Sequence, residues 1–158
     1  MYIQLENPPM PPRRPAKTAA DQIGAECIAV RVRLLNRTIT GIYDDALRPL
    51  GLTAGQLNML VVVARRTPVS PGDIARYLKM DKSTVSRNID RMREHGWLAV
   101  QAGTTGRDQL IELRAKGRQL LGRSLPRWKA AQARAKAVLG QRGAESIQRV
   151  GDAVWSQG

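Results

Sequence analysis

The sequence is poor in the residues that carry most enzyme chemistry. Its 158 residues include one cysteine and one histidine, Cys27 and His95, far apart in the chain. One cysteine excludes an internal disulfide framework and fits a reducing compartment. The pair leaves no zinc site and no Cys/His nucleophile, and the chain has no glycine-rich phosphate loop. We therefore expect a cytoplasmic protein that is not an enzyme and holds no metal or cofactor.

Long apolar runs and acidic residues are also scarce. No apolar stretch approaches the roughly 18 residues of a membrane-spanning helix, and the N-terminus has no signal-peptide core. The chain has 13 acidic residues against 26 Lys and Arg, which gives a net charge of +13. Such an excess predicts a polyanionic partner. Without a membrane segment, we expect that partner to be nucleic acid and expect no membrane association.

The first 17 residues have the composition of an extended tail. Prolines alternate there with basic residues: Pro8, Pro9, Pro11, Pro12, Pro15, Arg13, Arg14 and Lys17. Two interpretations stay open, a tail without a role and a basic arm that touches DNA or a partner subunit.

A long helix is predicted next, over about 19–47. Its apolar residues recur at helical spacing: Ile23, Cys27, Val30, Leu34, Ile42, Ala46 and Leu47. Pro49 and Gly51 should end it. A helix of this length in a small domain needs a cover for its apolar face, and a second subunit is the natural candidate.

The stretch 80–98, MDKSTVSRNIDRMREHGWL, predicts an amphipathic helix. Its apolar stripe consists of Val85, Ile89 and Met92. Asp81 can cap its start and Gly96 can end it. The opposite face carries hydroxyls and arginines, which let a helix approach a surface closely and donate to guanine edges or phosphates. A solvated helix would share this pattern, so the neighbouring segments have to decide.

Two shorter helices are predicted before this stretch. Thr53 and Gln56 form a capping box, and Ser70, Pro71 and Asp73 are typical of the first turn of another helix. The second of these helices leads through a short loop into the hydroxyl-rich one. This arrangement predicts a helix-turn-helix.

A hairpin should follow, because WLAVQA and QLIELR are strand-like runs around the turn-rich GTTGRD, with Arg107 near its tip. A hairpin directly after a recognition helix is the wing of a winged helix. Helical periodicity returns from about Lys116, and Pro126 should kink or break that helix. Gly140 and Gly143 should separate a last helix. We expect Trp97 and Trp128 to be core residues.

Eight basic residues and no acidic one lie between Leu113 and Leu139. They fit a solvated face, a second strip facing DNA, or a face balanced by acids elsewhere, and we favour the solvated face.

In its order of segments the chain resembles the MarR family of bacterial transcriptional regulators. The segments that carry the resemblance are YDDALRPLGLTAGQLNML, DIARYLKMDKSTVSRNIDRMREHGWL and GRDQLIELRAKG, and it extends over about 20–156. It implies a mainly α fold with a small β-hairpin, in which a winged helix-turn-helix lobe joins a helical dimerisation region. The implied parts are a basic tail at 1–18, a long dimerisation helix at 19–50, the DNA-binding lobe at 51–114 and C-terminal dimerisation helices at 115–158.

The resemblance also implies a function. A homodimer would bind palindromic double-stranded DNA, with the recognition helix in the major groove and the wing arginine in the minor groove. The implied DNA-binding residues are Lys82, Ser83, Thr84, Ser86, Arg87, Arg91 and Arg107. A small effector of unidentified structure would bind between the dimerisation helices and the lobe and release the DNA.

Three other functions stay open. Some relatives sense peroxides through a cysteine in the first helix, where this chain has Cys27, with Arg31 one turn later. Because Cys27 lies on the apolar stripe, we expect a packed thiol instead. The second alternative is a DNA-architectural protein without operator preference. The third is a module whose winged helix binds protein, against which the basic, hydroxyl-rich helix argues.

Overall fold

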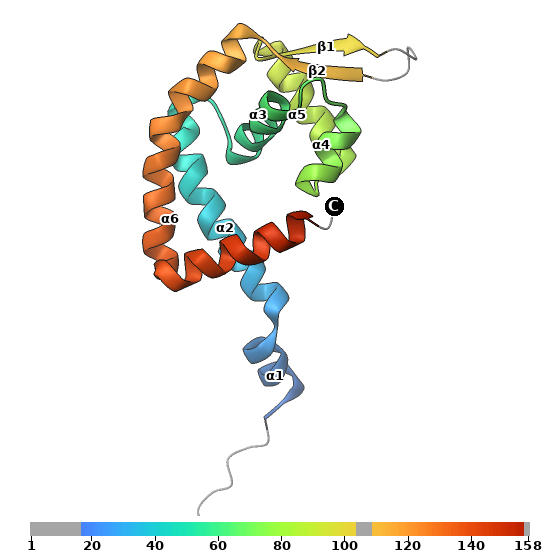
Figure 1. Cartoon of the computed structure of the whole chain (residues 1–158). Helices are drawn as coiled ribbons and strands as arrows, with labels where there is room; N and C mark the ends of the chain where they lie inside the picture. Colours follow the sequence, from blue (N-terminus) through green and yellow to red (C-terminus); the bar gives the residue numbers. More distant parts are fainter. Residues whose placement is uncertain (1–16, 104–108, 157–158) are drawn as a thin grey trace, which may run out of the picture. The chain divides into compact units, whose positions relative to one another are not determined.

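A computed structural model describes residues 17–103 and 109–156, which are mostly helical with one antiparallel hairpin (Figure 1). The elements are α1 (Ala19–Glu26), α2 (Ile28–Leu47), the 3₁₀ helix η1 (Arg48–Leu50), α3 (Ala54–Arg66), α4 (Pro71–Leu78), α5 (Lys82–Glu94), β1 (Leu98–Ala102), β2 (Gln109–Leu113) and α6 (Ala115–Ser156). The predicted fold class is confirmed. The chain divides between Leu35 and Asn36 into two compact units.

The helix predicted over 19–47 is wrong in one respect, because it breaks at Cys27. Cys27 has φ −64° and ψ 108°, which is extended backbone between α1 and α2. The Arg31 guanidinium donates to the carbonyl oxygens of Ala25 and Cys27. A side chain therefore satisfies carbonyls at the end of α1, where helical partners run out. The apolar spacing continues through the break, so the periodicity could not reveal it.

A single core holds α3, α4, α5 and the hairpin together. Its fully buried large side chains are Leu47, Met59, Leu60, Val63, Ile74, Val85, Met92, Leu98 and Ile111. The predicted capping box is present, since Thr53 accepts from the Gln56 amide and Gln56 accepts from the Thr53 amide. The Ala54 amide also donates to Asp44, at 2.7 Å, which ties the start of α3 to α2.

The hairpin pairs β1 with β2 in antiparallel register, from Leu98 opposite Leu113 to Ala102 opposite Gln109. A short bridge between Val69 and Ile111 adds the segment before α4 to this sheet. The predicted hairpin is confirmed, and Ile111 anchors it because this side chain is fully buried. We call residues 54–113 the winged lobe.

Helix α6 continues through Pro126 and breaks at Gly140, so of the kink or break predicted at Pro126 a break is excluded. Gly140 has φ 68° and ψ 164°, a conformation that glycine adopts and other residues avoid. The break expected near Gly140 and Gly143 is confirmed. The first half of α6 therefore spans 115–139 and the second half spans 141–156.

The two ends of α6 contact the winged lobe in different ways. Near the start, a Cβ added to Gly117 would lie 2.3 Å from the carbonyl oxygen of Trp97, so only glycine lets the helix pack there. Near the end, the Trp155 and Tyr77 ring centroids lie 5.0 Å apart, and the Arg66 guanidinium lies 4.1 Å from the Tyr77 centroid. Trp97 is buried as expected, whereas Trp128 is 36% exposed and does not belong to the core.

Candidate nucleic-acid interface

Helix α5 presents a polar face beside a buried apolar one. Val85, Ile89 and Met92 are buried, as their spacing predicts. Among the residues implied as DNA contacts, five are exposed and Thr84 is half-buried. The exposed five are Lys82, Ser83, Ser86, Arg87 and Arg91. The structure therefore brings these six residues together on one accessible helix.

Two side chains of this face bond to Thr84. The Arg87 guanidinium donates to the Thr84 hydroxyl at 3.3 Å, and the Asn88 amide donates to the Thr84 carbonyl at 2.9 Å. Arg93, by contrast, forms an ion pair with Asp90 at 3.3 Å. Arg87 keeps most of its donors for another acceptor, because a guanidinium has five and one weak bond uses one.

The start of α5 corrects one prediction. Asp81 occupies the N-cap position, but its side chain makes no capping hydrogen bond. The Asp81 carbonyl accepts the first regular hydrogen bond of the helix, from the Val85 amide at 3.0 Å. The backbone amides of the first turn of α5, which begins with Lys82 and Ser83, therefore donate no hydrogen bond to the Asp81 side chain.

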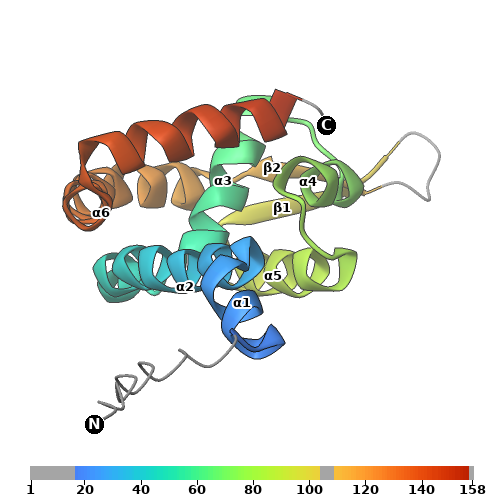
Figure 2. The same ribbon diagram turned by 90° about the horizontal axis from the view of Figure 1, so that it is seen from below.

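Helix α4 is fixed by the cap that the sequence predicts. The Ser70 hydroxyl accepts from the Asp73 amide at 3.1 Å and donates to the Asp73 carboxylate at 2.7 Å. This hydroxyl bond, with a smaller contribution from Arg76, lowers the pKa of Asp73. The turn to α5 closes through Lys79, which has a left-handed backbone with φ 51°. Figure 2 shows α4 and α5 side by side.

The wing is described only in its strands. Arg107, the implied minor-groove residue, lies outside the described residues. What the structure does fix is the base of the hairpin, because Trp97 and Leu98 are buried directly after α5. The His95 ring stacks on Trp97, with centroids 4.6 Å apart. The hairpin is therefore anchored to the C-terminal end of α5.

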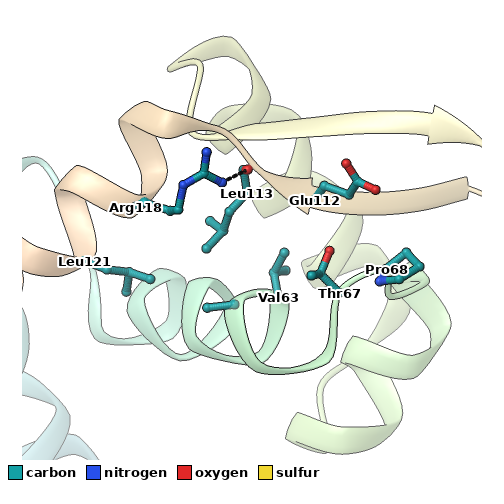
Figure 3. A pocket seen from close by; sticks show the side chains of 8 residues that line it. Val63, Thr67, Pro68, Glu112, Leu113, Arg118 and Leu121 are labelled. Carbon is teal, nitrogen blue, oxygen red and sulfur yellow. Dashed lines mark hydrogen bonds between the residues drawn. The ribbon is translucent and has the colours of Figure 1, made fainter.

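A pocket of about 450 Å³ lies among α3, β2 and the first half of α6 (Figure 3). It is lined by Val63, Ala64, Thr67, Pro68, Glu112, Leu113, Arg118 and Leu121. The Arg118 guanidinium donates to the Leu113 carbonyl at 2.7 Å. The sequence did not predict a pocket here, because its residues come from α3, the loop after it, β2 and α6 and meet only in the folded chain.

Residues 17–103 and 109–156 offer neither a cluster of metal-binding side chains nor a single membrane-spanning helix. No group of three or more His, Cys, Asp or Glu side chains there could hold a metal ion. In the same ranges no single helix is long and apolar enough to cross a membrane. By length and composition only the bent pair Ile28–Leu50 and Ala54–Arg66 passes that test, and its second helix is part of the core.

A helix-turn-helix whose second helix leads into a two-stranded hairpin defines a winged helix-turn-helix protein. Known proteins agree with this class. Residues 50–108 match the sequence profile of the MarR family. The uncharacterized HTH-type transcriptional regulator YwoH of Bacillus subtilis is 31% identical over 77 residues, which cover 49% of this chain and 56% of YwoH. The chain thus spans little more than half of that curated relative.

Solved structures extend the likeness over most of the chain. The Mycobacterium tuberculosis regulator MosR in complex with DNA is 34% identical with a TM-score of 0.70, covering 83% of this chain and 98% of MosR. Bordetella bronchiseptica BpsR, whose DNA binding is regulated by 6-hydroxynicotinic acid, has a TM-score of 0.73. It is 21% identical, over 82% of this chain and 94% of its own, and so supports the fold alone. The chain belongs to the MarR family of transcriptional regulators.

Proposed function

We propose that this protein binds palindromic double-stranded DNA as a homodimer and represses transcription until a small molecule releases it. The observation that carries the proposal is the exposed hydroxyl and arginine face of α5. In this proposal Lys82, Ser83, Thr84, Ser86, Arg87 and Arg91 contact the major groove, and Arg107 enters the minor groove. MosR, which shares a third of its residues with this chain, has been crystallised with DNA, and this supports the assignment.

Exposed apolar side chains support the homodimer. In α1 and α2 they include Ile23, Ile28, Val30, Val32 and Leu34, and in α6 they include Val138, Ile147, Val150 and Val154. Monomers rarely expose so many large apolar groups on neighbouring turns. In this proposal a second copy covers them, and the regions 19–50 and 115–158 form the dimer. The predicted DNA-binding lobe at 51–114 then stays free for DNA.

The pocket supports a small-molecule effector. Its volume of about 450 Å³ falls in the range of ligand sites. It lies where α6 leaves the winged lobe, so a ligand between Val63 and Leu121 would alter the angle between that helix and the lobe. Such a change would alter the distance between two recognition helices in a dimer. Glu112 and Arg118 at the pocket favour a ligand with both a donor and an acceptor.

Selection from a random duplex library at about 0.15 M salt tests the proposal. We expect an enriched palindrome with half-sites about one helical turn apart, bound at least 10³-fold more tightly than random duplex. Equal affinity for the palindrome and random DNA would instead identify an architectural protein, because nonspecific binding depends on phosphates.

The peroxide alternative is tested on the same palindrome. Cys27 is half-buried at the helix break, and Arg31 donates there to backbone carbonyls. We expect dilute organic hydroperoxide to leave the DNA complex intact in the wild type and in Cys27→Ser alike. Release from the wild type alone would make Cys27 the sensor.

A further inference from the structure

The first half of α6 is the most one-sidedly charged part of the chain. With the residue before it, it carries eight basic side chains, and the nearest acidic residues are Glu112 and Glu145. The eight are Arg114, Lys116, Arg118, Arg123, Arg127, Lys129, Arg134 and Lys136, and all are exposed. Together they are called the basic face.

Helical geometry sorts the basic face into two rows, because successive residues turn by about 100°. One row holds Lys116, Arg123, Arg127 and Arg134, and the other holds Arg114, Arg118, Lys129 and Lys136. The rows lie on opposite flanks of the helix. Leu120, Ser124 and Ala131 face the protein between them and are buried. The outer strip between the rows is exposed and contains Gly122, Pro126, Ala130 and Ala133.

The basic face is not neutralised within the described part of the chain. The ion pairs found there are Lys17–Glu26, Arg48–Asp45, Arg76–Asp73 and Arg93–Asp90, and none involves α6. Of the eight basic side chains, only Arg118 makes a hydrogen bond within the described residues, to the Leu113 carbonyl. So many like charges on one helix repel each other, and a polyanion would relieve this repulsion. The basic face therefore has the electrostatics of a binding surface.

We propose that the basic face binds the phosphate backbone of duplex DNA outside the segment that α5 holds. From 116 to 136 the helix rises by about 30 Å. Duplex DNA carries a charge for about every 1.7 Å of its axis, so phosphates are available along the whole face. Cations on both flanks of the helix match phosphates on both sides of a groove, and the small outer residues let the helix come close.

The same features argue against other polyanions. A helix that lies on a membrane inserts large apolar side chains opposite its charges. The outer strip between the two rows has none, and its residues are glycine, alanine, proline and glutamine. A protein partner would be expected to find an aromatic or aliphatic anchor in the contact, which this strip also lacks. Duplex DNA needs neither.

The position of the basic face makes it a second contact. In Figures 1 and 2 the first half of α6 leads away from α4 and α5, which lie at the other side of the winged lobe. The DNA that it holds is therefore the flank of the duplex bound by α5 or a second duplex.

Salt-dependent binding to a random-sequence duplex of about 60 base pairs tests the proposal. The variant Arg123→Gln/Arg127→Gln/Arg134→Gln is compared with a matched control, Arg48→Gln/Arg65→Gln/Arg149→Gln, which loses the same three charges elsewhere. We expect the α6 variant to lower the slope of log affinity against log salt by about 2–3 units per protomer. The control should lower it by less than about one. Light scattering and circular dichroism confirm that both variants keep their assembly and helix content.

Equal slope losses in the two variants would overturn the proposal, since overall charge would then explain the binding. If the triple α6 variant fails to fold, Lys129→Gln/Lys136→Gln from the other row repeats the test. Capture of a labelled duplex by a bead-bound short duplex separates a second duplex from a flank. Vesicles of phosphatidylcholine and phosphatidylglycerol should not bind, and tighter binding to them than to DNA through the basic face would also overturn it. In the Arg87→Ala/Arg91→Ala background, the triple α6 substitution should still lower the salt slope by the same amount. Failure of the proposed operator recognition by α5 can therefore be distinguished from failure of DNA binding by the basic face.

Discussion

Arg87 and Arg93 of α5 have different partners in the folded chain, and their substitution should therefore have different effects on DNA binding. Arg87 has one long bond to Thr84, whereas Arg93 is paired with Asp90. We expect Arg87→Ala to lose about 1–3 kcal/mol of discrimination between operator and random DNA per subunit, because a bidentate base contact has this value. Competition binding with the selected palindrome measures it.

Arg93→Ala is the matched control, since it removes an arginine from the same helix. It should leave operator discrimination within about twofold, because an exposed ion pair contributes little. If the two substitutions have equal effects, α5 contacts DNA through charge alone and its proposed orientation is wrong.

Ser70 gives a prediction with a pH signature. The Ser70 hydroxyl lowers the pKa of Asp73 in the folded chain. The ionised Asp73 carboxylate therefore stabilises the folded chain at pH values above the ordinary pKa of aspartate. This stability is lost as the pH falls through the lowered pKa of the folded state. Ser70→Ala should cost about 1 kcal/mol at pH 7, as loss of a helix cap does. At pH 3 the loss should shrink, because Asp73 is then largely protonated in the unfolded chain. Urea unfolding at both pH values, with Asp73→Asn as control, measures this; an equal loss at both would contradict it.

The sequence predicted residues well where partners are close in the chain. The caps at Thr53 and Ser70 depend on residues three positions away, and both are present. Asp81 occupies the predicted N-cap position, but its side chain makes no capping hydrogen bond. That bond depends on the side-chain rotamer, which the sequence does not determine. The pocket was not foreseen, since Val63, Glu112 and Leu121 meet only through tertiary packing.

At the scale of elements, two glycines of α6 allow the effect of tertiary packing to be measured separately from the effect of helix propensity. Gly117→Ala places a Cβ against the backbone oxygen of Trp97, which cannot move without shifting the start of β1. We expect a loss of about 1–3 kcal/mol in the free energy of unfolding, as overpacking costs. Denaturant unfolding measures it.

Gly122→Ala is the control in the same helix, because nothing lies within 4 Å of its added Cβ. Alanine at an exposed helical position should raise the free energy of unfolding by up to about 1 kcal/mol. A gain at both positions would mean that α6 does not pack on Trp97 as described.

Helix ends were the weakest part of the sequence-based prediction, for a physical reason. Apolar periodicity continues through Cys27, where the chain leaves the helix, and through Pro126, where it does not. Proline removes one amide donor and clashes with the preceding turn, yet α6 stays helical through Pro126, so the residue type alone did not decide where the helix ends. Gly140 was foreseen as a break because its freedom at positive φ is a property of the residue itself.

At the scale of the whole molecule, the exposed apolar side chains predict the assembly. Val150→Asp adds a charge to a side chain that is 60% exposed in the single chain. If a second copy covers it, the variant should be monomeric at micromolar concentration, and operator affinity should fall at least 100-fold because two half-sites are no longer held together.

Light scattering and operator titration measure both effects, and Gln148→Asp is a control on the same helix. Gln148 is exposed and polar, and its substitution should leave the dimer intact. A wild-type monomer at micromolar concentration would contradict the dimer directly.

The break at Gly140 has a consequence for how this chain tolerates genetic variation. With φ 68° and ψ 164°, this backbone is closed to every side chain. Any missense codon there favours a continuous rod of 42 residues, which would carry Trp155 away from Tyr77. In a library of all single substitutions, variants at position 140 should therefore lose DNA binding, whereas most substitutions at the neighbouring positions should be tolerated. The direction of the second half of α6, residues 141–156, therefore depends on the absence of one carbon atom at position 140.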